Sequence, residues 1–329
     1  MEHRELGRTQ RSVSVIGLGT WQLGADWGSV DENDALAVLD AAHAGGVDFF
    51  DTADVYGDGR SEQLIGRWLK ANPEAGVTVA TKMGRRVEQV PEAYTLEAFR
   101  AWNDRSRENL GMDTLDLVQL HCPPTAVYSN DAVYDALDTL VAEGRIANYG
   151  VSVETVDEAL TAIARPNVAT VQIIVNAFRH KPIEQVLPAA REAGVGVIAR
   201  VPLASGLLAN RYTEDTRFAA DDHRNFNRDG SAFDVGETFS GVDYATGLQA
   251  AREFAELAAA EAPGASSAQV ALTWLAAQDG ISTVIPGARS TAQALANAAA
   301  GSLRISGEFS ASVRDLYDRK LRAQIHPRW

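Results

Sequence analysis

The amino-acid sequence predicts a parallel (β/α)8 barrel, and a repeated pattern along its 329 residues is the main reason. Short apolar runs that suit buried strands alternate eight times with longer segments whose apolar residues recur at helical spacing. Several helical segments end at a glycine, such as Gly111 or Gly144, as is common at helix C-caps. A doubly wound open sheet is the alternative arrangement of the same alternation.

Each predicted strand precedes its predicted helix, and a weak alternation over residues 4–14 favours a short hairpin before the first pair. The strand and helix pairs cover residues 16–21 and 31–44, 47–51 and 61–70, 78–82 and 96–110, 116–121 and 131–143, 146–152 and 156–163, 170–176 and 183–193, 195–200 and 248–261, and 283–286 and 291–299. Two additional helices are predicted at residues 267–277 and 310–323, towards the C-terminus.

No linker-like composition divides the chain, so we expect one barrel domain over residues 1–329. The connection over residues 202–246, after the seventh strand, is far longer than the few residues typical of a strand-to-helix loop. Its aromatic and basic side chains are Phe218, His223, Arg224, Phe226 and Arg228. We therefore expect this connection to act as a lid over a site.

The composition limits the possible partners. A net charge of −14 and an isoelectric point near 4.9 argue against a nucleic acid or an anionic membrane surface as a partner. The single cysteine, Cys122, excludes an internal disulfide, and no N-terminal segment resembles a secretion signal. No apolar run reaches the roughly 18 residues of a membrane span. We expect a cytoplasmic protein, and the sequence does not indicate its oligomeric state.

Polar side chains stand at the ends of three consecutive predicted strands. Asp51, Lys82 and His121 each end an otherwise apolar run, and Tyr56 follows Asp51 in a loop rich in Asp and Gly. In a parallel barrel these strand ends share one face, so the four side chains should converge. Taken singly, each also has an ordinary structural explanation, such as a lysine that reaches solvent or a histidine bonded within the core.

The pairing of a carboxylate with a lysine favours a functional explanation. Burying Asp51 and Lys82 separately would be costly, so the two are expected to form an ion pair. A free tyrosine has a pKa of about 10 and exchanges protons poorly at neutral pH unless a cation stabilises its phenolate. Lys82, held by Asp51, could supply that cation to Tyr56.

These segments resemble the successive motifs of the aldo-keto reductase superfamily, and the resemblance covers essentially the whole chain. The similar segments are residues 17–21, 51–57, 61–62, 81–82, 119–121, 150–152, 201–208 and 285–290. The chain is more similar to bacterial members than to vertebrate carbonyl reductases. The resemblance implies an oxidoreductase that transfers a hydride between NADP(H) and the carbonyl or alcohol carbon of a small aldehyde, ketone or sugar.

The resemblance also implies a role for each site residue. Tyr56 would be the general acid in reduction and the base in oxidation, and Lys82 and Asp51 would tune it. His121 would orient the carbonyl by hydrogen bonding or assist proton transfer. The implied cofactor contacts are Gly19, Thr20, Trp21, Asp51, Ser152, Gln172, Arg200, Pro202, Leu203, Ser205, Gly206, Leu207, Gly287, Arg289, Gln293 and Asn297. The expected substrate contacts are Trp21, Trp27, Tyr56 and His121.

The segment over residues 286–290 offers backbone amides, a helix N-terminus, a hydroxyl and Arg289, which together suit the extra phosphate of NADP(H). NAD(H) is therefore the less expected cofactor. Two positions depart from the family pattern. Val153 stands where an asparagine often follows Ser152, and Arg200 stands where an aromatic ring often stacks on the nicotinamide. A cation there would favour the reduced, uncharged ring.

Other catalytic motifs are absent from the sequence. It contains no complete G-x-G-x-x-G, no Walker loop, no H-E-x-x-H and no C-x-x-C, and the pair His121-Cys122 has too few ligands for a metal site. Two rival functions fit the same pattern. One is a barrel aldolase or lyase in which Lys82 forms a Schiff base. The other is a regulatory or scaffold subunit that binds nucleotide with little turnover.

Overall fold

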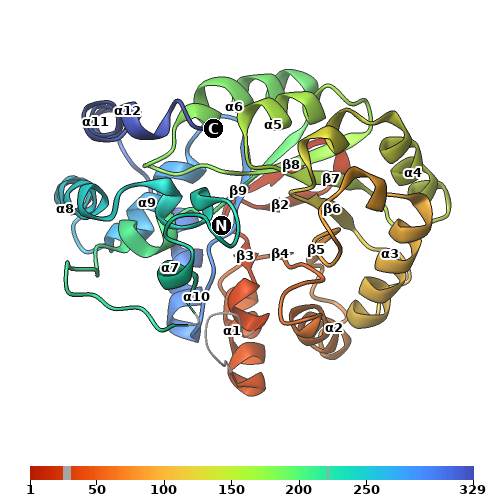
Figure 1. Cartoon of the computed structure of the whole chain (residues 1–329). Coiled ribbons are helices and arrows are strands. Elements are labelled where there is room, and N and C mark those ends of the chain that lie inside the picture. Colours follow the sequence, from red (N-terminus) through yellow and green to blue (C-terminus); the bar gives the residue numbers. More distant parts are fainter. Residues whose placement is uncertain (25–30, 221) are drawn as a thin grey trace.

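The computed structural model describes residues 1–24, 31–220 and 222–329, and its core is a parallel eight-stranded barrel (Figure 1). The strands pair in the order of the chain from β3 to β10, and the bridges Ile16–Val284 and Gly19–Gly287 join the first strand to the last segment. The predicted barrel is thereby confirmed. The barrel strands are β3 (Leu18–Gly19), β4 (Phe49–Asp51), β5 (Thr78–Met83), β6 (Leu117–His121), β7 (Tyr149–Ser152), β8 (Val168–Ile174), β9 (Gly196–Arg200) and β10 (Ile281–Val284).

Helices surround the barrel, as Figure 1 shows. They are α1 (Glu32–Ala44), α2 (Arg60–Ala71), α3 (Leu96–Leu110), α4 (Asp131–Ala142), α5 (Val156–Ile163), α6 (Lys181–Ala193), α8 (Tyr244–Glu261), α9 (Ser267–Ala276), α10 (Thr291–Ala299), α11 (Gly307–Lys320) and α12 (Arg322–Ile325). Side-chain caps help to set their starts: Thr155 and Glu158 form a reciprocal capping box at α5. None of the helices in the described part of the chain is both long and apolar enough to cross a membrane.

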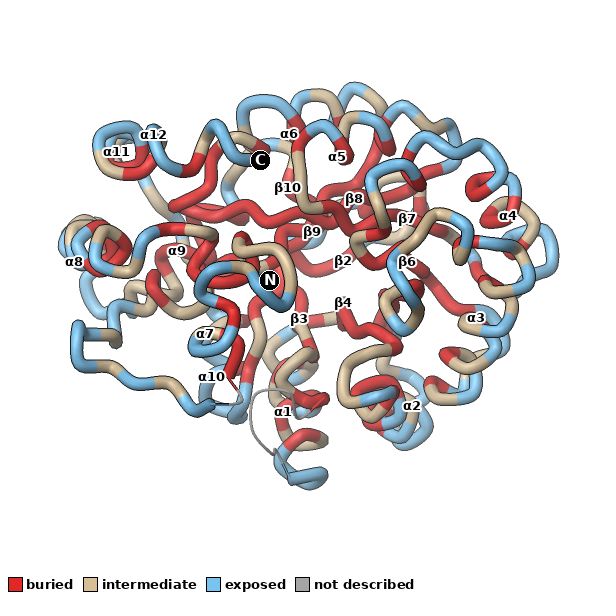
Figure 2. The backbone as a smooth tube through the Cα atoms, in the orientation of Figure 1, coloured by how far each residue is buried: buried red, intermediate tan, exposed pale blue. Residues whose placement is uncertain are grey.

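The N-terminal hairpin covers the barrel's N-terminal end. It consists of β1 (His3–Glu5) and β2 (Ser12–Ser14), which pair antiparallel. Between them, Leu6 belongs to one buried apolar cluster with residues from inside the barrel, such as Leu117. Gly7 adopts φ +52°, and a Cβ there would lie 2.0 Å from the backbone nitrogen of Gly196, so only glycine fits. The hairpin leaves the opposite end of the barrel for a site, and Figure 2 shows the strands as the buried centre of the molecule.

Most predicted strand bounds differ from the observed ones by one to three residues, and the ends of the first and last strands matter most for the site. Residues 20–21 leave the first strand, because Trp21 begins a short 3-10 helix, Trp21–Gly24. The backbone N–H of Leu23 donates to the carbonyl of Thr20 at 3.0 Å. The apolar pattern of the sequence does not predict a turn of this kind. The last strand ends at Val284 rather than at residue 286, and the following segment reaches the cofactor region proposed below.

The long connection after β9 is confirmed, and part of its described length is folded into short helices. It contains the short helices η5 (Ala204–Ala209), α7 (His223–Phe226), η6 (Val235–Glu237) and η7 (Phe239–Gly241) before α8 begins at Tyr244. Sequence periodicity did not predict these single turns, which are too short to show a repeating pattern. Whether this connection opens and closes as a lid stays a prediction.

Candidate active site

Asp51, Tyr56 and Lys82 meet at the C-terminal end of the barrel. The Nζ of Lys82 donates to Asp51 Oδ1 at 2.5 Å, to the carbonyl of Thr52 at 2.9 Å and to the Tyr56 hydroxyl at 3.2 Å. Asp51 and Lys82 are only 2% and 1% exposed, so the predicted buried ion pair is present. All three donors of the ammonium group thus have acceptors, which offsets the cost of burying its charge.

Two glutamines complete the surroundings of the Asp51 carboxylate. Its second oxygen accepts from Gln172 Nε2 at 2.8 Å and from Gln119 Nε2 at 3.2 Å. Gln119 points into the barrel from β6 and Gln172 from β8, so the bonds span the barrel interior. These amides hold Asp51 in one orientation and thereby fix the ammonium group beside Tyr56. Sequence reasoning did not assign a role to Gln119.

Opposing influences act on the proton of Tyr56. Burial raises the pKa of its phenol above 10, Lys82 lowers the pKa, and Asp51 raises it again, with a net upward shift. For Lys82, burial alone would lower the pKa, but Asp51 and Tyr56 together raise it, so the ammonium stays charged. Tyr56 is therefore protonated at neutral pH and hydrogen bonded to a permanent cation, as a proton donor requires.

His121 ends β6 next to Tyr56. Its ring lies 5.9 Å from the Tyr56 ring, centroid to centroid, and nearly perpendicular to it. The pKa of His121 lies well below its ordinary value of 6.5 because the ring is buried and because Arg85, Lys82 and Arg200 repel a proton. The imidazole is therefore neutral and can offer one N–H to a carbonyl oxygen. Its Nδ1 has no partner among the described residues.

A cavity of about 470 Å³ opens above these residues. It contains Tyr56 and His121 at one end and Arg289 at the other, a size and shape that suit an extended ligand. All but one of the predicted cofactor residues line it. The exception is Leu207, which is packed in the core at 1% exposure, and its contact with the cofactor stays a prediction. The sequence pattern could not show on which side of the short helix η5 it lies.

An aromatic wall stands at the Tyr56 end of the cavity. Trp21 stacks on Tyr56 with 6.1 Å between ring centroids, and His223 and Phe233 of the long connection lie 5.3 Å and 6.4 Å from Trp21. Trp21 thus occupies the position predicted for a substrate contact. The other predicted tryptophan, Trp27, lies outside the described residues. His223 and Phe233 were not predicted as site residues, because their distance along the chain from the strands gives no signal.

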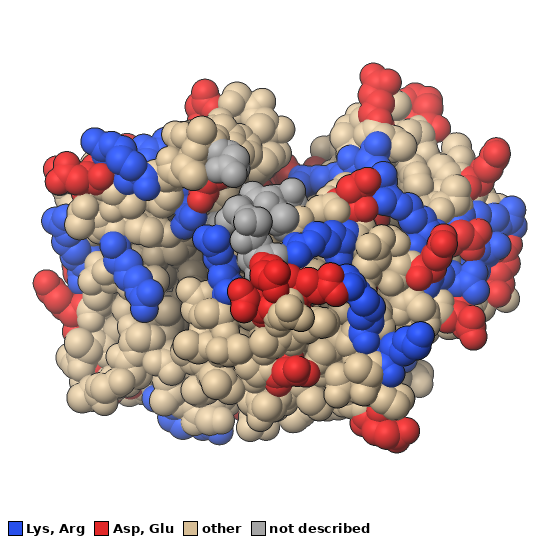
Figure 3. All heavy atoms as spheres, turned by 90° about the horizontal axis from the view of Figure 1, so that it is seen from below, with Lys and Arg blue, Asp and Glu red and all other residues tan. Residues whose placement is uncertain are grey.

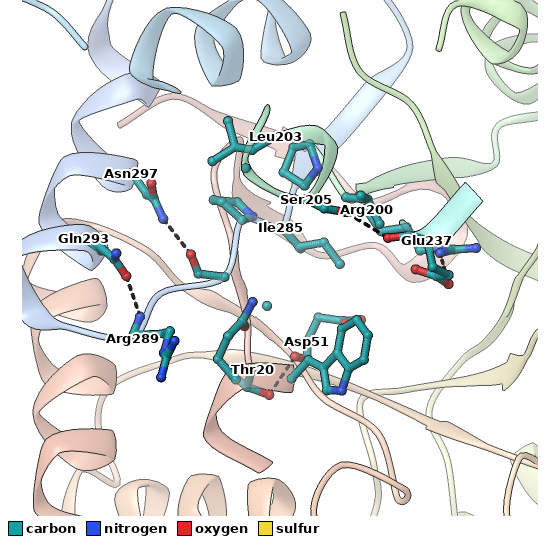
Figure 4. A pocket seen from close by; sticks show the side chains of 18 of the residues that line it. Thr20, Asp51, Arg200, Leu203, Ser205, Glu237, Ile285, Arg289, Gln293 and Asn297 are labelled. Carbon is teal, nitrogen blue, oxygen red and sulfur yellow. Dashed lines mark hydrogen bonds and ion pairs between the residues drawn. The ribbon is translucent and has the colours of Figure 1, made fainter. Parts of the chain in front are cut away.

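Arg200 ends β9 at the cavity wall, but it is not an isolated cation. Its Nη1 forms an ion pair with Glu237, and its Nη2 donates to the carbonyl of Val153 at 3.0 Å. Both side chains are buried, at 7% and 8% exposure, and Figure 4 shows the pair at one side of the cavity. The expectation of a positive charge beside the nicotinamide is therefore corrected to a neutralised pair. Glu237 lies in η6, and no sequence pattern connected it to Arg200.

The two residues expected to hold a carboxamide are partly engaged within the protein. Gln172 uses its Nε2 on Asp51, so its amide oxygen is the group that remains for a ligand. Ser152 accepts from the thiol of Cys122, with 3.4 Å between the sulfur and oxygen atoms. Both residues line the cavity, as predicted, and their contact with a cofactor stays a prediction.

The far end of the cavity is built from the segment before α10. Gln293 accepts from the backbone N–H of Arg289 at 2.8 Å, and Asn297 donates to the carbonyl of Gly287 at 3.1 Å (Figure 4). These bonds hold the segment against the helix while Arg289 stays exposed. Gly287 packs so closely that a Cβ would lie 2.2 Å from the Gln22 side chain. Ser290 caps α10 by accepting from the backbone N–H of Gln293.

The match to a family model settles the classification. The model of the aldo/keto reductase family matches residues 15–318. The chain belongs to the aldo/keto reductase family. Among its relatives is an aldo-keto reductase of Strobilurus tenacellus, which is 32% identical over 328 residues that cover 95% of this chain and 91% of the relative.

Solved structures of this aldo-keto reductase family superpose on the whole chain. A glycerol dehydrogenase from Gluconobacter oxydans matches with a TM-score of 0.81 and 27% identity, over 99% of this chain and 98% of the other. An aldo-keto reductase from Klebsiella pneumoniae in complex with NADPH matches with a TM-score of 0.71 and 25% identity, over 96% of both chains. The family and the fold are thus established, and the chain is an oxidoreductase by family.

Proposed function

We propose that this aldo-keto reductase uses NADP(H) to interconvert a small aldehyde, ketone or sugar and the corresponding alcohol. The observation that carries the proposal is the Tyr56 hydroxyl, which lies 3.2 Å from the buried ammonium of Lys82 at one end of the cavity. A proton donor fixed in this way is what carbonyl reduction needs on the oxygen side. Asp51, Tyr56, Lys82 and His121 are the catalytic residues of the proposal.

The residues of the cavity fit a dinucleotide. Its length connects the Tyr56 end to the Arg289 end, and Ser205 and Gly206 adopt positive φ of 54° and 96°, which turns the backbone at the wall. Ser152 and Gln172 would hold the carboxamide, and the Trp21 and Arg200 side chains would flank the ring. The remaining proposed contacts are the other predicted cofactor residues that line the cavity, Gly19, Thr20, Pro202, Leu203, Gly287, Arg289, Gln293 and Asn297.

The nicotinamide supplies or accepts the hydride, and this chain's residues manage the proton and the oxygen. In reduction, His121 and Tyr56 donate hydrogen bonds to the carbonyl oxygen and make its carbon more electrophilic. Tyr56 then transfers its proton to the developing alkoxide, and Lys82 stabilises the phenolate that remains. In oxidation the same phenolate takes the alcohol proton. The neutralised Arg200–Glu237 pair removes the electrostatic reason for expecting the reduced, uncharged nicotinamide to be favoured.

The cofactor preference rests on one cation. Arg289 is exposed at the cavity end next to the start of α10, where a helix N-terminus also favours an anion. The NADPH complex of the Klebsiella pneumoniae structure supports the same choice. The name of the Gluconobacter oxydans structure, a glycerol dehydrogenase, favours a small hydroxylated compound as one substrate class.

Further features of the proposal concern the protein as a whole. We propose that residues 1–329 act as one domain, with a small carbonyl or alcohol compound as the partner and no metal in catalysis. Among the described residues no three His, Cys, Asp or Glu side chains form a metal-binding group. Figure 3 shows acidic and basic side chains mixed over the face in view, without a continuous basic patch for a nucleic acid. A cytoplasmic location and the absence of membrane partners stay predictions.

The deciding experiment compares wild type with Tyr56→Phe. NADPH consumption with a panel of aldehydes, ketones and aldoses should fall about 10²- to 10⁴-fold in the variant, because the ring stays and the proton donor is lost. NADPH affinity, measured by fluorescence, should change little. Tyr149→Phe removes a hydroxyl that bonds to Asp138 of α4 outside the cavity wall, and it should retain activity. Near-normal turnover of a folded Tyr56→Phe protein would overturn the proposed role.

The same assays decide between the rival functions. A Schiff-base enzyme would be trapped on Lys82 by borohydride and substrate, whereas the proposed reductase gives no such adduct. A regulatory or scaffold subunit would bind NADPH and consume none of it with any compound in the panel. The intact set of Tyr56, Lys82, Asp51 and His121 favours turnover.

A further inference from the structure

Arg85 lines the cavity at the Tyr56 end, and the proposed proton and hydride transfers do not involve it. It follows β5 by two residues and so stands above the same strand that supplies Lys82. Its side chain is one-quarter exposed, and its carboxylate partner, Glu154, accepts from Nη2 at 3.0 Å. Glu154 does not line the cavity, so it contacts Arg85 on the side away from the cavity.

The backbone around Arg85 is held in place. Gly84 adopts φ +108°, which turns the chain at the end of β5, and a Cβ there would lie 3.0 Å from the Tyr94 ring. The carbonyl of Gly84 accepts from Gln89 Nε2 at 2.8 Å, and the hydroxyl of Tyr94 donates to Gln89 Oε1 at 3.1 Å. Arg85 therefore projects from a fixed turn rather than from a free loop end.

Most of the donors of Arg85 remain available. A guanidinium carries five N–H groups, and the bond from Nη2 to Glu154 is the hydrogen bond that Arg85 makes within the described part of the chain. The nearby Arg200 differs, because Nη1 and Nη2 both bind acceptors and Nε is buried. At this end of the cavity, Arg85 is thus the guanidinium with donors to spare for a ligand.

Arg85 also acts on the group that orients the carbonyl. After burial, its positive charge is the largest influence that lowers the pKa of His121. Arg85 follows the end of β5 and lines the same cavity as His121 and Tyr56, so it is placed to contact a small molecule whose carbonyl meets those two residues. A planar carboxylate matches two parallel N–H groups of a guanidinium, whereas a phosphate dianion would call for further cations.

We infer that Arg85 is a specificity-determining residue that binds the carboxylate of an aldehyde acid or keto acid, and of the hydroxy acid formed from it. The inference rests on the proposed reductase function and narrows its substrate to anionic compounds with the carbonyl a few bonds from the carboxylate. It also gives Arg85 a role in KM rather than in proton transfer, because Tyr56 and His121 keep the carbonyl oxygen.

The test uses a matched pair of substrates, succinic semialdehyde and its methyl ester, which share the aldehyde and differ in charge. Wild type should prefer the acid in kcat/KM. In Arg85→Ala the KM for the acid should rise about tenfold to a hundredfold, as for the loss of a charge-assisted hydrogen bond, and the values for the ester should change less than threefold. Arg85→Lys should keep part of the preference, since it keeps the charge without the planar fork.

Arg86→Ala provides the matched control. Arg86 is the next residue, its guanidinium pairs with Asp58, and it is not part of the cavity wall, so the variant removes the same charge without touching the proposed subsite. It should retain the preference for the acid. A purely structural role of the Arg85–Glu154 pair would instead lower kcat/KM for acid and ester equally and lower the melting temperature of Arg85→Ala.

Binding of succinate to the NADPH complex supplies a readout without turnover. By calorimetry, Arg85→Ala should weaken succinate binding about tenfold or more while Arg86→Ala does not. Equal treatment of acid and ester by wild type, or unchanged succinate binding in Arg85→Ala, would overturn the inference and leave the reductase function intact. Failure to reduce either aldehyde would contradict the proposed function, and succinate binding would still decide the role of Arg85.

Discussion

Arg200 at the end of β9 forms a buried ion pair with Glu237 of the long connection, which fastens that connection to the barrel rim. Burial raises the pKa of Glu237, but Arg200 and Arg85 lower it by more than burial raises it. The pKa of Glu237 therefore lies below its ordinary value, and the carboxylate stays charged. Within the connection, Ser205 of η5 ties this region together, since its hydroxyl donates to the carbonyl of Glu237 at 2.9 Å and accepts from the N–H of Phe239.

Glu237→Gln should therefore destabilise the fold. The amide keeps the shape but leaves the Arg200 charge buried without a partner, and loss of one member of a buried pair costs about 3–5 kcal/mol. Urea unfolding measures the change in the free energy of unfolding. Glu32→Gln is the control, because it breaks a pair with Arg67 in which both side chains are about half exposed, and its effect should be near zero. Similar small losses in both variants would mean that Arg200 is solvated.

The contrast between this pair and the Asp51–Lys82 pair shows what the sequence can predict. Asp51 and Lys82 each interrupt an apolar strand run, and parallel strand ends must meet on one face of a barrel, so their pairing follows from periodicity. Glu237 lies in a single helical turn 37 residues beyond Arg200, where no repeating pattern exists. Arg85 lies three residues after Lys82, just beyond the strand end, but no motif in the sequence distinguishes it from an ordinary loop arginine.

Lys82→Met should change the pH dependence of catalysis as well as its rate. Lys82 lowers the pKa of Tyr56 and balances Asp51, so its removal raises that pKa further. Alcohol oxidation needs the phenolate, and its activity should move to higher pH and fall about 10²- to 10⁴-fold at neutral pH. Rate profiles from pH 6 to 11 in the oxidative direction measure this shift. A reduced rate with an unmoved profile would refute the tuning role of Lys82.

His180 should make stability depend on pH far from the site. It is buried between Tyr317, 4.0 Å away, and Trp274, 5.2 Å away, and burial lowers its pKa from 6.5 to about 3. Between these values the unfolded chain binds a proton that the folded chain does not, so stability falls as pH falls from about 6.5 to 3. The contribution of one such group approaches about 1.4 kcal/mol per pH unit.

His180→Phe keeps a ring in the stack and removes this titration. Urea unfolding at a series of pH values should give a shallower loss of stability below pH 6.5 than in wild type. Phe309→Leu removes a buried ring that packs on Phe254 and no titrating group, so it should lower stability and keep the wild-type slope. An identical slope in wild type and His180→Phe would show that His180 does not titrate in this window.

Arg289 offers the clearest test of cofactor choice, because its neighbours are fixed while its guanidinium is exposed. The backbone N–H of Arg289 binds Gln293, Asn297 binds Gly287, and Ser290 caps α10, so replacing the Arg289 side chain leaves every one of these bonds.

The 2′-phosphate distinguishes NADP(H) from NAD(H), and a guanidinium that contacts it provides a charge-assisted hydrogen bond. Arg289→Ala should raise the KM for NADPH about tenfold or more and leave the KM for NADH within about twofold. Arg304→Ala removes another exposed arginine, one that lies outside the cavity wall, so it controls for the change in the net charge of −14. Equal increases for the two cofactors in Arg289→Ala would assign this arginine to the part that NADPH and NADH share, and the preference for NADP(H) would then require another source.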